Sequence, residues 1–192
     1  MCDYHESWSG MLNRIIFPPH LLVSGFCVAF LLGGCQFGKK SQQPVKIQVN
    51  VSRVVSGQTL EVLGMGNQPT LISQVKLIGV EAPDLRQRPW GIRARKRLQE
   101  LIGKEEPVTL EFDILARDKI GRTLAYVWKD GTLLNEQLVE EGYVLYVAHS
   151  PNQKYNPRLE RAQQWARLMA EEIWNPAKPM PLTPYQFRRQ YR

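Results

Sequence analysis

The sequence predicts an α+β fold that is mainly β, a small five-stranded barrel accompanied by three helices. Several short segments carry apolar side chains at every second position, a pattern typical of half-buried strands. Other segments carry them every three or four positions, a pattern typical of amphipathic helices. The length of 192 residues suits one ordinary domain with some tail, and the content of 43% hydrophobic and 22% charged residues excludes a disordered or fibrous chain.

Four of the five expected strands are followed by a turn signal or a polar stretch. Ile47, Val49 and Val51 alternate with polar residues, and the Ser56-Gly57 turn joins them to a second strand. The complete set of expected strands is 47–51, 60–62, 71–80, 108–114 and 123–128. Five short strands separated by turns favour a small barrel.

Helices are expected at 90–102, 133–141 and 156–173. The second stops at Gly142, a natural C-cap, and the third begins with Asn156 followed by proline at its first position. The apolar face of the third helix comprises Leu159, Ala162, Ala166, Met169 and Ile173. The proline-rich segment 176–192 is basic and aromatic, and it is expected to be a flexible tail.

The N-terminus resembles a bacterial lipoprotein signal. Residues 21–34 form an uncharged apolar run of fourteen, which suits a signal peptide better than a membrane span of about 20 residues. The run ends in Leu-Gly-Gly, and the next residue, Cys35, would be lipidated and become the new N-terminus. We therefore expect a signal peptide at 1–34, a tether at 35–44 and an exported, membrane-anchored envelope protein. The alternatives are a secreted protein, an uncleaved N-terminal anchor or a start site that gives no export.

The charge balance indicates an anionic partner. The formal charge of +7 rises to +8 when residues 1–34 are removed, because that segment holds one basic and two acidic residues. Nucleic acid and an acidic membrane surface both fit such a surplus. All three cysteines lie within the first 35 residues, which excludes a disulfide framework or a thiolate zinc site in the rest of the chain.

Three segments place polar residues where the apolar pattern does not require them. They are SGQT at 56–59, KLIGVEAPD at 76–84 and RDKIGR at 117–122. Glu81 and Asp84 flank a proline turn, so both carboxylates can face one cation or one water molecule. Each segment alone reads most simply as a surface turn or an exposed salt bridge.

The order and spacing of these segments resemble the staphylococcal nuclease family over residues 45–175. Further matching stretches are LNEQLV at 134–139 with Gly142, and Ile173-Trp174. The resemblance implies a five-stranded OB-fold barrel with three helices. It also implies calcium-dependent hydrolysis of phosphodiester bonds in DNA and RNA.

Three residues match the catalytic positions of that family. Arg122 matches an arginine that binds the phosphate and stabilises its developing charge. Lys76 stands where a second arginine is usual, and it keeps the charge but not the planar fork of donors. Asp84 stands at the position of the glutamate that activates or orients water, and it is one methylene shorter.

The resemblance also implies a metal site and substrate contacts. Glu81, Gln58 and the Ala82 carbonyl match its metal ligands, with Gln58 replacing an aspartate. The expected ion is Ca²⁺, with Mn²⁺ or Mg²⁺ as alternatives, because the ligand charge is reduced. Tyr146 matches a substrate-binding aromatic residue, and Lys119 is expected to contact substrate.

Two functional hypotheses follow. The first is a nuclease, weakened where its site departs from the family pattern. The second is a catalytically silent OB-fold module that binds nucleic acid or protein at the cell envelope. A purely structural envelope protein is a third reading. Nothing in the sequence indicates an oligomer.

Overall fold

The computed structural model describes residues 45–65, 70–104 and 107–191. The expected signal peptide and tether lie outside these described residues. In the described ranges no helix combines the length and apolarity that crossing a bilayer requires. In chain order the elements are β1 (Lys46–Ser56), β2 (Thr59–Leu63), β3 (Ser73–Leu77), β4 (Val80–Glu81), α1 (Trp90–Ile102), β5 (Pro107–Glu111), β6 (Thr123–Lys129), β7 (Thr132–Leu133), α2 (Leu134–Glu140), β8 (Leu145–Tyr146), α3 (Asn156–Leu168), the 3₁₀ helix η1 (Glu172–Trp174) and α4 (Pro184–Gln190).

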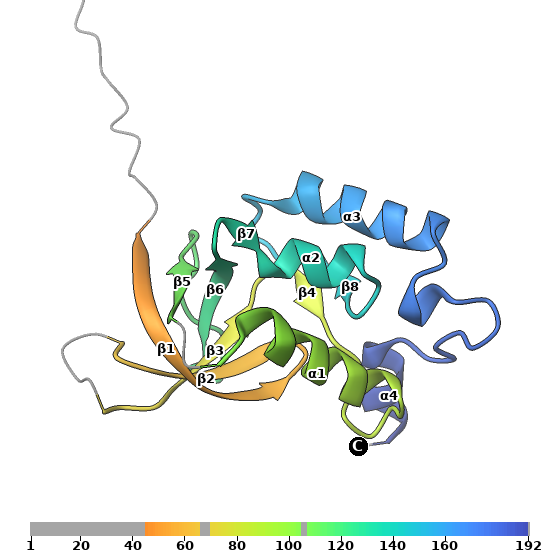
Figure 1. Cartoon of the computed structure of the whole chain (residues 1–192), viewed down its shortest axis with the longest axis horizontal. Helices are drawn as coiled ribbons and strands as arrows, with labels where there is room; N and C mark the ends of the chain where they lie inside the picture. Colours follow the sequence, from red (N-terminus) through yellow and green to blue (C-terminus); the bar gives the residue numbers. More distant parts are fainter. Residues whose placement is uncertain (1–44, 66–69, 105–106, 192) are drawn as a thin grey trace, which may run out of the picture. The chain divides into compact units, whose positions relative to one another are not determined.

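Five strands close into a barrel (Figure 1). β1 pairs antiparallel with β2 and with β5, β2 pairs antiparallel with β3, and β5 pairs antiparallel with β6. Parallel pairing of β3 with β6 completes the ring. β1 pairs with β5 through its first half and with β2 through its second half, and two irregularities in its register with β2, after Val51 and after Val54, bend the strand. The predicted five-stranded barrel is confirmed.

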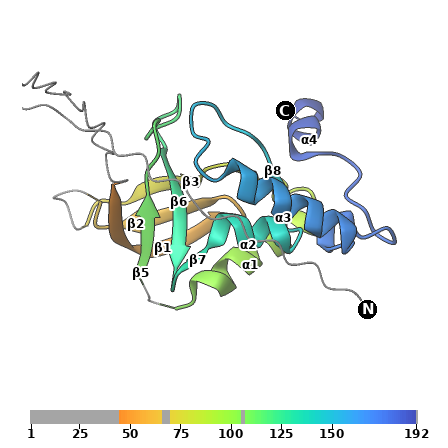
Figure 2. The same cartoon turned by 90° about the horizontal axis from the view of Figure 1, so that it is seen from above.

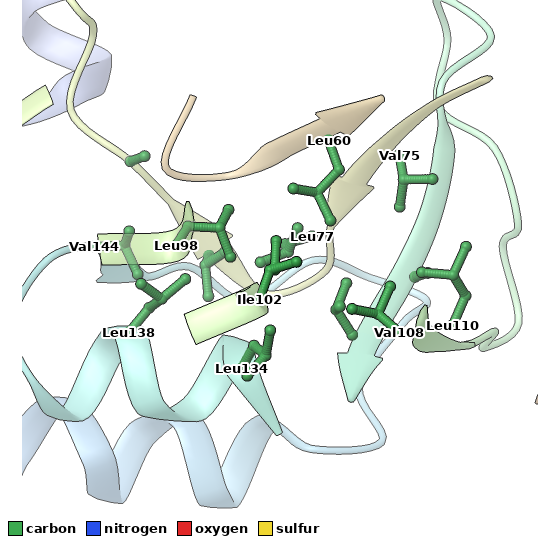
Figure 3. Close-up of a cluster of buried hydrophobic side chains, with 14 of the residues drawn as sticks. Leu60, Val75, Leu77, Leu98, Ile102, Val108, Leu110, Leu134, Leu138 and Val144 are labelled. Carbon is green, nitrogen blue, oxygen red and sulfur yellow. The ribbon is translucent and has the colours of Figure 1, made fainter. Parts of the chain in front are cut away.

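The barrel interior and the inner faces of two helices form one apolar core. Leu60 and Leu77 from the barrel, Leu98 from α1, and Leu134 and Leu138 from α2 are all at most 1% exposed. Figure 3 shows these side chains gathered between the strands and the two helices. Alternation in the strands and the three- and four-residue spacing in α1 therefore mark the residues that are buried. The core fixes β3 and β6 as rigid supports for the polar residues beside them.

α3 lies alongside α2 in both views (Figures 1 and 2) and is shorter than the sequence predicts. It ends at Leu168, because Ala170 has a φ of +57° and the next amide, that of Glu171, donates to the Ala166 carbonyl. Met169 is consequently 50% exposed, whereas Ile173 returns to the core from η1. An alanine takes the left-handed position that glycine usually marks, so the sequence gives no stop signal there.

The expected third strand is divided in the structure. β3 ends at Leu77, and Gly79, with a φ of +75°, turns the chain into the separate short strand β4. β4 leaves the barrel and pairs with β8. This turn brings the segment around Glu81 back towards the end of β3.

The C-terminal segment is helical, whereas the sequence predicts a flexible tail. Thr183 and Gln186 form a capping box, in which the Gln186 amide donates to the Thr183 hydroxyl and the Gln186 side-chain oxygen accepts from the Thr183 amide. α4 follows this cap and gives the described residues a fourth α-helix beside the three expected.

Candidate functional site

A small cavity lies where β3, β4 and the segment after β8 meet. Its volume is about 190 Å³, and its walls include Lys76, Glu81, Leu124, Val147 and His149. Lys76 and Glu81 are two of the residues that the sequence singles out. Lys76 lies near the end of β3 and Glu81 on β4, and the Gly79 turn lies between the two strands.

Lys76 is a half-buried cation on a barrel strand. It lies opposite Thr59 of β2 and Leu124 of β6 in the sheet register. Burial lowers the pKa of its ammonium group, and the positive charges of Arg122 and Arg188 lower it further, while the carboxylate of Asp118 acts in the opposite direction. The lysine therefore stands among like charges, an arrangement that favours an anionic ligand.

Arg122 is held by its own turn. One carboxylate oxygen of Asp118 accepts hydrogen bonds from the amides of Ile120 (3.1 Å) and Arg122 (2.9 Å). The other accepts from Arg122 Nε at 2.8 Å and lies 2.8 Å from its Nη2. Nη1 has no such contact with Asp118, so Asp118 fixes the guanidinium while leaving a donor for another group. The next residue, Thr123, begins β6 and pairs with Val75 of β3, so Arg122 lies in the turn that leads into the strand beside Lys76.

Glu81 does not stand free at the cavity wall. Its Oε1 forms an ion pair with Nη2 of Arg188, which comes from α4. The Glu81 side chain is 20% exposed and the Arg188 side chain 38% exposed, so the pair is partly shielded from water. The guanidinium of Arg188 thus binds the Glu81 carboxylate, which the family resemblance assigns to a metal ion.

Gln58 acts as a structural link. Its side-chain Oε1 accepts a hydrogen bond of 2.6 Å from the amide of Ala82, and its main-chain carbonyl accepts from the Leu77 amide at 2.9 Å. Ala82 itself is buried. Gln58 therefore ties the β1–β2 turn both to the end of β3 and to the residue after β4.

Asp84 is paired with a nearby arginine. Its Oδ1 accepts from the Arg86 amide at 3.0 Å and from Arg86 Nε at 2.9 Å, and its Oδ2 accepts from Arg86 Nη2 at 3.2 Å. The hydrogen bond from the Arg86 side chain is the main cause of a lowered pKa for Asp84. The carboxylate is therefore ionised at neutral pH, and it is directed to Arg86 rather than to the cavity wall.

The implied calcium site can be compared with these contacts. Among the described residues no group of three or more His, Cys, Asp or Glu side chains converges as metal ligands would. Glu81 is paired with Arg188, and the Gln58 oxygen accepts from Ala82. A hard cation prefers several oxygen ligands with net negative charge. In the arrangement described, Glu81, Gln58 and Ala82 do not fit such an ion.

The remaining predicted residues lie in different places. Tyr146 pairs with Val80 across β8 and β4, and burial raises the pKa of its hydroxyl. Lys119 is exposed at the tip of the Asp118 turn. Cys35 lies outside the described residues. Lys76 and Glu81 thus line the same cavity, and the charge of Arg122 acts on Lys76. Asp84 and Lys119 are not part of the cavity wall.

Three residues near the site are not among those that the sequence singles out. Arg188 lies in the segment expected to be flexible, Arg86 lies outside the matching motifs, and His149 enters the cavity wall from the loop after β8. Asp84 and Arg86 are close enough in the chain for their pair to be foreseen from spacing alone. Glu81 and Arg188 are 107 residues apart, so only the fold reveals that they meet.

Comparison with known proteins assigns the chain to a family with this fold. The family model described as "Staphylococcal nuclease homologue" matches residues 74–176. A thermonuclease from Staphylococcus hyicus is 35% identical over 130 residues, which cover 65% of this chain and 74% of that protein. A thermonuclease from Staphylococcus intermedius is 31% identical over 150 residues, covering 76% of this chain and 86% of that protein. Endonuclease YncB from Bacillus subtilis (strain 168) is 34% identical over 137 residues, covering 67% of this chain and 62% of that protein.

Proposed function

Since the chain belongs to the staphylococcal nuclease family, we propose that it hydrolyses phosphodiester bonds within DNA or RNA chains. The observation that carries this proposal is a pair of cations, Lys76 on β3 and Arg122 in the turn that leads into the neighbouring strand β6. Lys76 lines the cavity, and the positive charge of Arg122, in the turn before β6, contributes to lowering the pKa of Lys76. Similarity to proteins named thermonuclease and endonuclease supports the same reaction class.

The two cations act on the phosphate. Arg122, fixed by Asp118, donates from its remaining guanidinium hydrogens to a phosphate oxygen. Lys76 adds a second positive charge in a partly desolvated position, where its interaction with an anion is stronger than in water. The attraction of both cations for the phosphate increases as negative charge builds on it in the transition state. Removal of either is expected to slow the chemical step more than it weakens substrate binding.

We assign the orientation of the attacking water to Asp84. Its lowered pKa keeps it as a carboxylate, which is the form able to accept a proton or a hydrogen bond from water. Arg86 donates hydrogen bonds to that carboxylate here, so the attacking water must either displace Arg86 or bind the carboxylate beside it. Glu81, Gln58 and Ala82 do not fit a divalent ion in this arrangement, and no step is assigned to one. The expected need for Ca²⁺, Mn²⁺ or Mg²⁺ is a property to be measured directly.

The test is digestion of single-stranded DNA, duplex DNA and RNA by the full chain, each with Ca²⁺, with Mn²⁺, with Mg²⁺ and with EDTA. Internal fragments that vanish with Arg122→Ala support the proposal. Lys96→Ala is the matched control, since Lys96 is a basic residue on α1 whose side chain is 77% exposed. Absence of digestion under every ionic condition, with the protein folded, would exclude the nuclease.

A second candidate function is a module that binds nucleic acid without cutting it. The observation in its favour is that both carboxylates assigned by the sequence, Glu81 and Asp84, are paired with arginines. In that case the oligonucleotide remains intact while its binding weakens steeply with salt. The digestion experiment separates the two, because only the enzyme yields shortened products.

We propose further that the protein is exported and anchored to the membrane through a lipid on Cys35. The support is the apolar run 21–34, which ends in Leu-Gly-Gly and is followed by Cys35. Mass spectrometry of the native protein is expected to find a lipid-modified Cys35 as the first residue. An intact 1–34 segment would contradict this proposal.

A further inference from the structure

The C-terminal helix α4 is bound to the loop between β4 and α1. The Gln87 side chain donates from Nε2 to the Leu182 carbonyl at 2.9 Å, and Arg86 donates from Nη1 to the Tyr191 carbonyl at 2.9 Å. The Arg86 guanidinium also lies 5.5 Å from the centre of the Phe187 ring. Contacts thus hold both ends of α4 and its middle, so the position of the helix is determined by the fold.

This docking places one arginine at the site and its neighbour away from it. Arg188 forms the ion pair with Glu81. Arg189 instead lies 5.8 Å from the ring centre of Tyr185, which is an exposed residue of the same helix. Two adjacent residues of equal charge therefore differ in their surroundings: Arg188 is half-buried and contacts Glu81 of the cavity wall, whereas Arg189 is exposed.

Three positive charges consequently act around one cavity of about 190 Å³. Lys76 and Glu81 line it, and Arg188 contacts Glu81. The positive charges of Arg122 and Arg188 both lower the pKa of Lys76. Glu81 offsets one of these charges and Asp118 offsets another. A net positive charge remains, and it is concentrated where the proposed function places a phosphate.

We propose that Arg188 is a resident cation of the phosphate-binding site, occupying the Glu81 carboxylate that the family resemblance assigns to a divalent metal ion. This inference deepens the proposed function and rests on it for the identity of the ligand. The contact with Glu81 uses Nη2, and a guanidinium carries five N–H donors in all. The remaining donors are the groups through which Arg188 binds a phosphate oxygen, so phosphate binding does not depend on an added metal ion.

The experiment measures binding of a fluorescent single-stranded oligodeoxynucleotide to the full chain in EDTA and in CaCl₂. The wild type is expected to bind in EDTA, with little change on adding Ca²⁺. Arg188→Ala should weaken binding in EDTA by about tenfold or more, as the loss of a charge-assisted hydrogen bond implies. It should also reduce the slope of log affinity against log salt by about 0.7, the value for one contact with a single strand. Arg189→Ala, the matched control, should leave affinity within about threefold and the slope unchanged.

Glu81→Gln supplies an independent variant at the same ion pair. It removes the negative charge and leaves Arg188, so binding in EDTA should be retained or become tighter. Loss of binding with Glu81→Gln as large as that with Arg188→Ala would overturn the inference, since the ion pair rather than the cation would then matter. Thermal denaturation of each variant identifies any change that comes from unfolding.

Other outcomes also overturn the inference. They are tighter binding by Arg188→Ala, which would make α4 an obstruction, equal losses with Arg188→Ala and Arg189→Ala, or wild-type binding that requires Ca²⁺. Cleavage is scored separately from binding. Metal-independent, Arg188-dependent binding without cleavage sustains the inference and refutes the nuclease, whereas cleavage with unchanged Arg188→Ala binding does the reverse.

Discussion

Replacing Asp118 with asparagine tests whether the turn before β6 positions the phosphate-binding arginine. The variant keeps the oxygen that accepts from the main-chain amides of Ile120 and Arg122. An uncharged NH₂ group replaces the other oxygen, which accepts from Arg122 Nε at 2.8 Å. Hydrogen bonds to charged groups contribute about 1.5–3 kcal/mol to stability. The Asp118 and Arg122 side chains are 14% and 25% exposed, so some solvent screening reduces that value. We expect Asp118→Asn to lower the free energy of unfolding by about 1–2 kcal/mol.

The same substitution should slow cleavage. If the loss of about 1.4 kcal/mol also appears in the transition state, kcat/KM falls about tenfold, because each such increment is a factor of ten in rate. The measurements are urea denaturation and initial cleavage rates of a labelled oligonucleotide. Asp130→Asn is the control, since it removes the same charge from a turn residue whose side chain is 82% exposed. Equal effects of Asp118→Asn and Asp130→Asn on stability and rate would refute the reasoning.

The stability difference should also depend on pH. Burial alone would raise the pKa of Asp118, but hydrogen bonds from Arg122 outweigh it, so the pKa is lowered in the folded protein. A carboxyl group whose pKa is lower in the folded than in the unfolded protein stabilises the fold at pH values above its unfolded pKa of about 3.9. This contribution is lost as the pH falls through the folded pKa. The difference between wild type and Asp118→Asn is therefore largest near neutrality and shrinks in strong acid.

Three further predictions concern other parts of the site and its support. Changing Glu111 to glutamine should lower the free energy of unfolding by about 1.5–3 kcal/mol, because the fully buried Glu111 side chain loses its charge-assisted hydrogen bond with Lys154, which is 35% exposed. The pairing lowers the Glu111 pKa against the opposing effect of burial, so this loss should diminish as urea denaturation is repeated at acid pH. Gly142→Ala should lower the melting temperature by several degrees, because φ is +71° there and a Cβ would lie 2.5 Å from the Glu171 carbonyl oxygen. Cleavage should decline with rising pH as Lys76 loses its proton, at a lower pH than an ordinary lysine would, and Lys76→Arg should remove this decline.

Controls for these three predictions come from the same chain. Glu100→Gln changes a carboxylate whose side chain is 47% exposed and should leave stability nearly unchanged. Gly131→Ala shares a positive φ of +79° but meets no atom within 4 Å, so it separates backbone strain from collision. Equal losses at positions 111 and 100, equal melting temperatures at 142 and 131, or an alkaline decline that persists in Lys76→Arg would each contradict the corresponding explanation.

The sequence predicts the barrel because its strands depend on local alternation. Leu60 and Val62 are fully buried, and the helical spacing of α1 brings Ala94 and Leu98 to the same core. Where backbone geometry breaks the pattern, the prediction fails. The end of α3 is an example, because Ala170 adopts a left-handed conformation that alanine rarely signals.

The site is less predictable than the fold, because its contacts join distant segments. The motifs locate Lys76, Arg122 and Glu81, and the structure brings these three into one electrostatic environment. They do not show that Gln58 would bind the Ala82 amide. Nor do they show that Arg188 would reach Glu81, since nothing near position 81 in the chain encodes a partner from the C-terminal helix.

The central claim, that Lys76 and Arg122 act together on one phosphate, is tested most directly by a double-mutant cycle. Single-turnover cleavage of a labelled oligonucleotide is measured for wild type, Lys76→Met, Arg122→Ala and the double variant. Each single substitution should reduce the rate about 100-fold or more, as loss of a transition-state donor does. The double variant should lose much less than the product of the two, because both cations act at the same step on the same group. Reductions that multiply, or a single variant that cleaves at the wild-type rate, would contradict the claim.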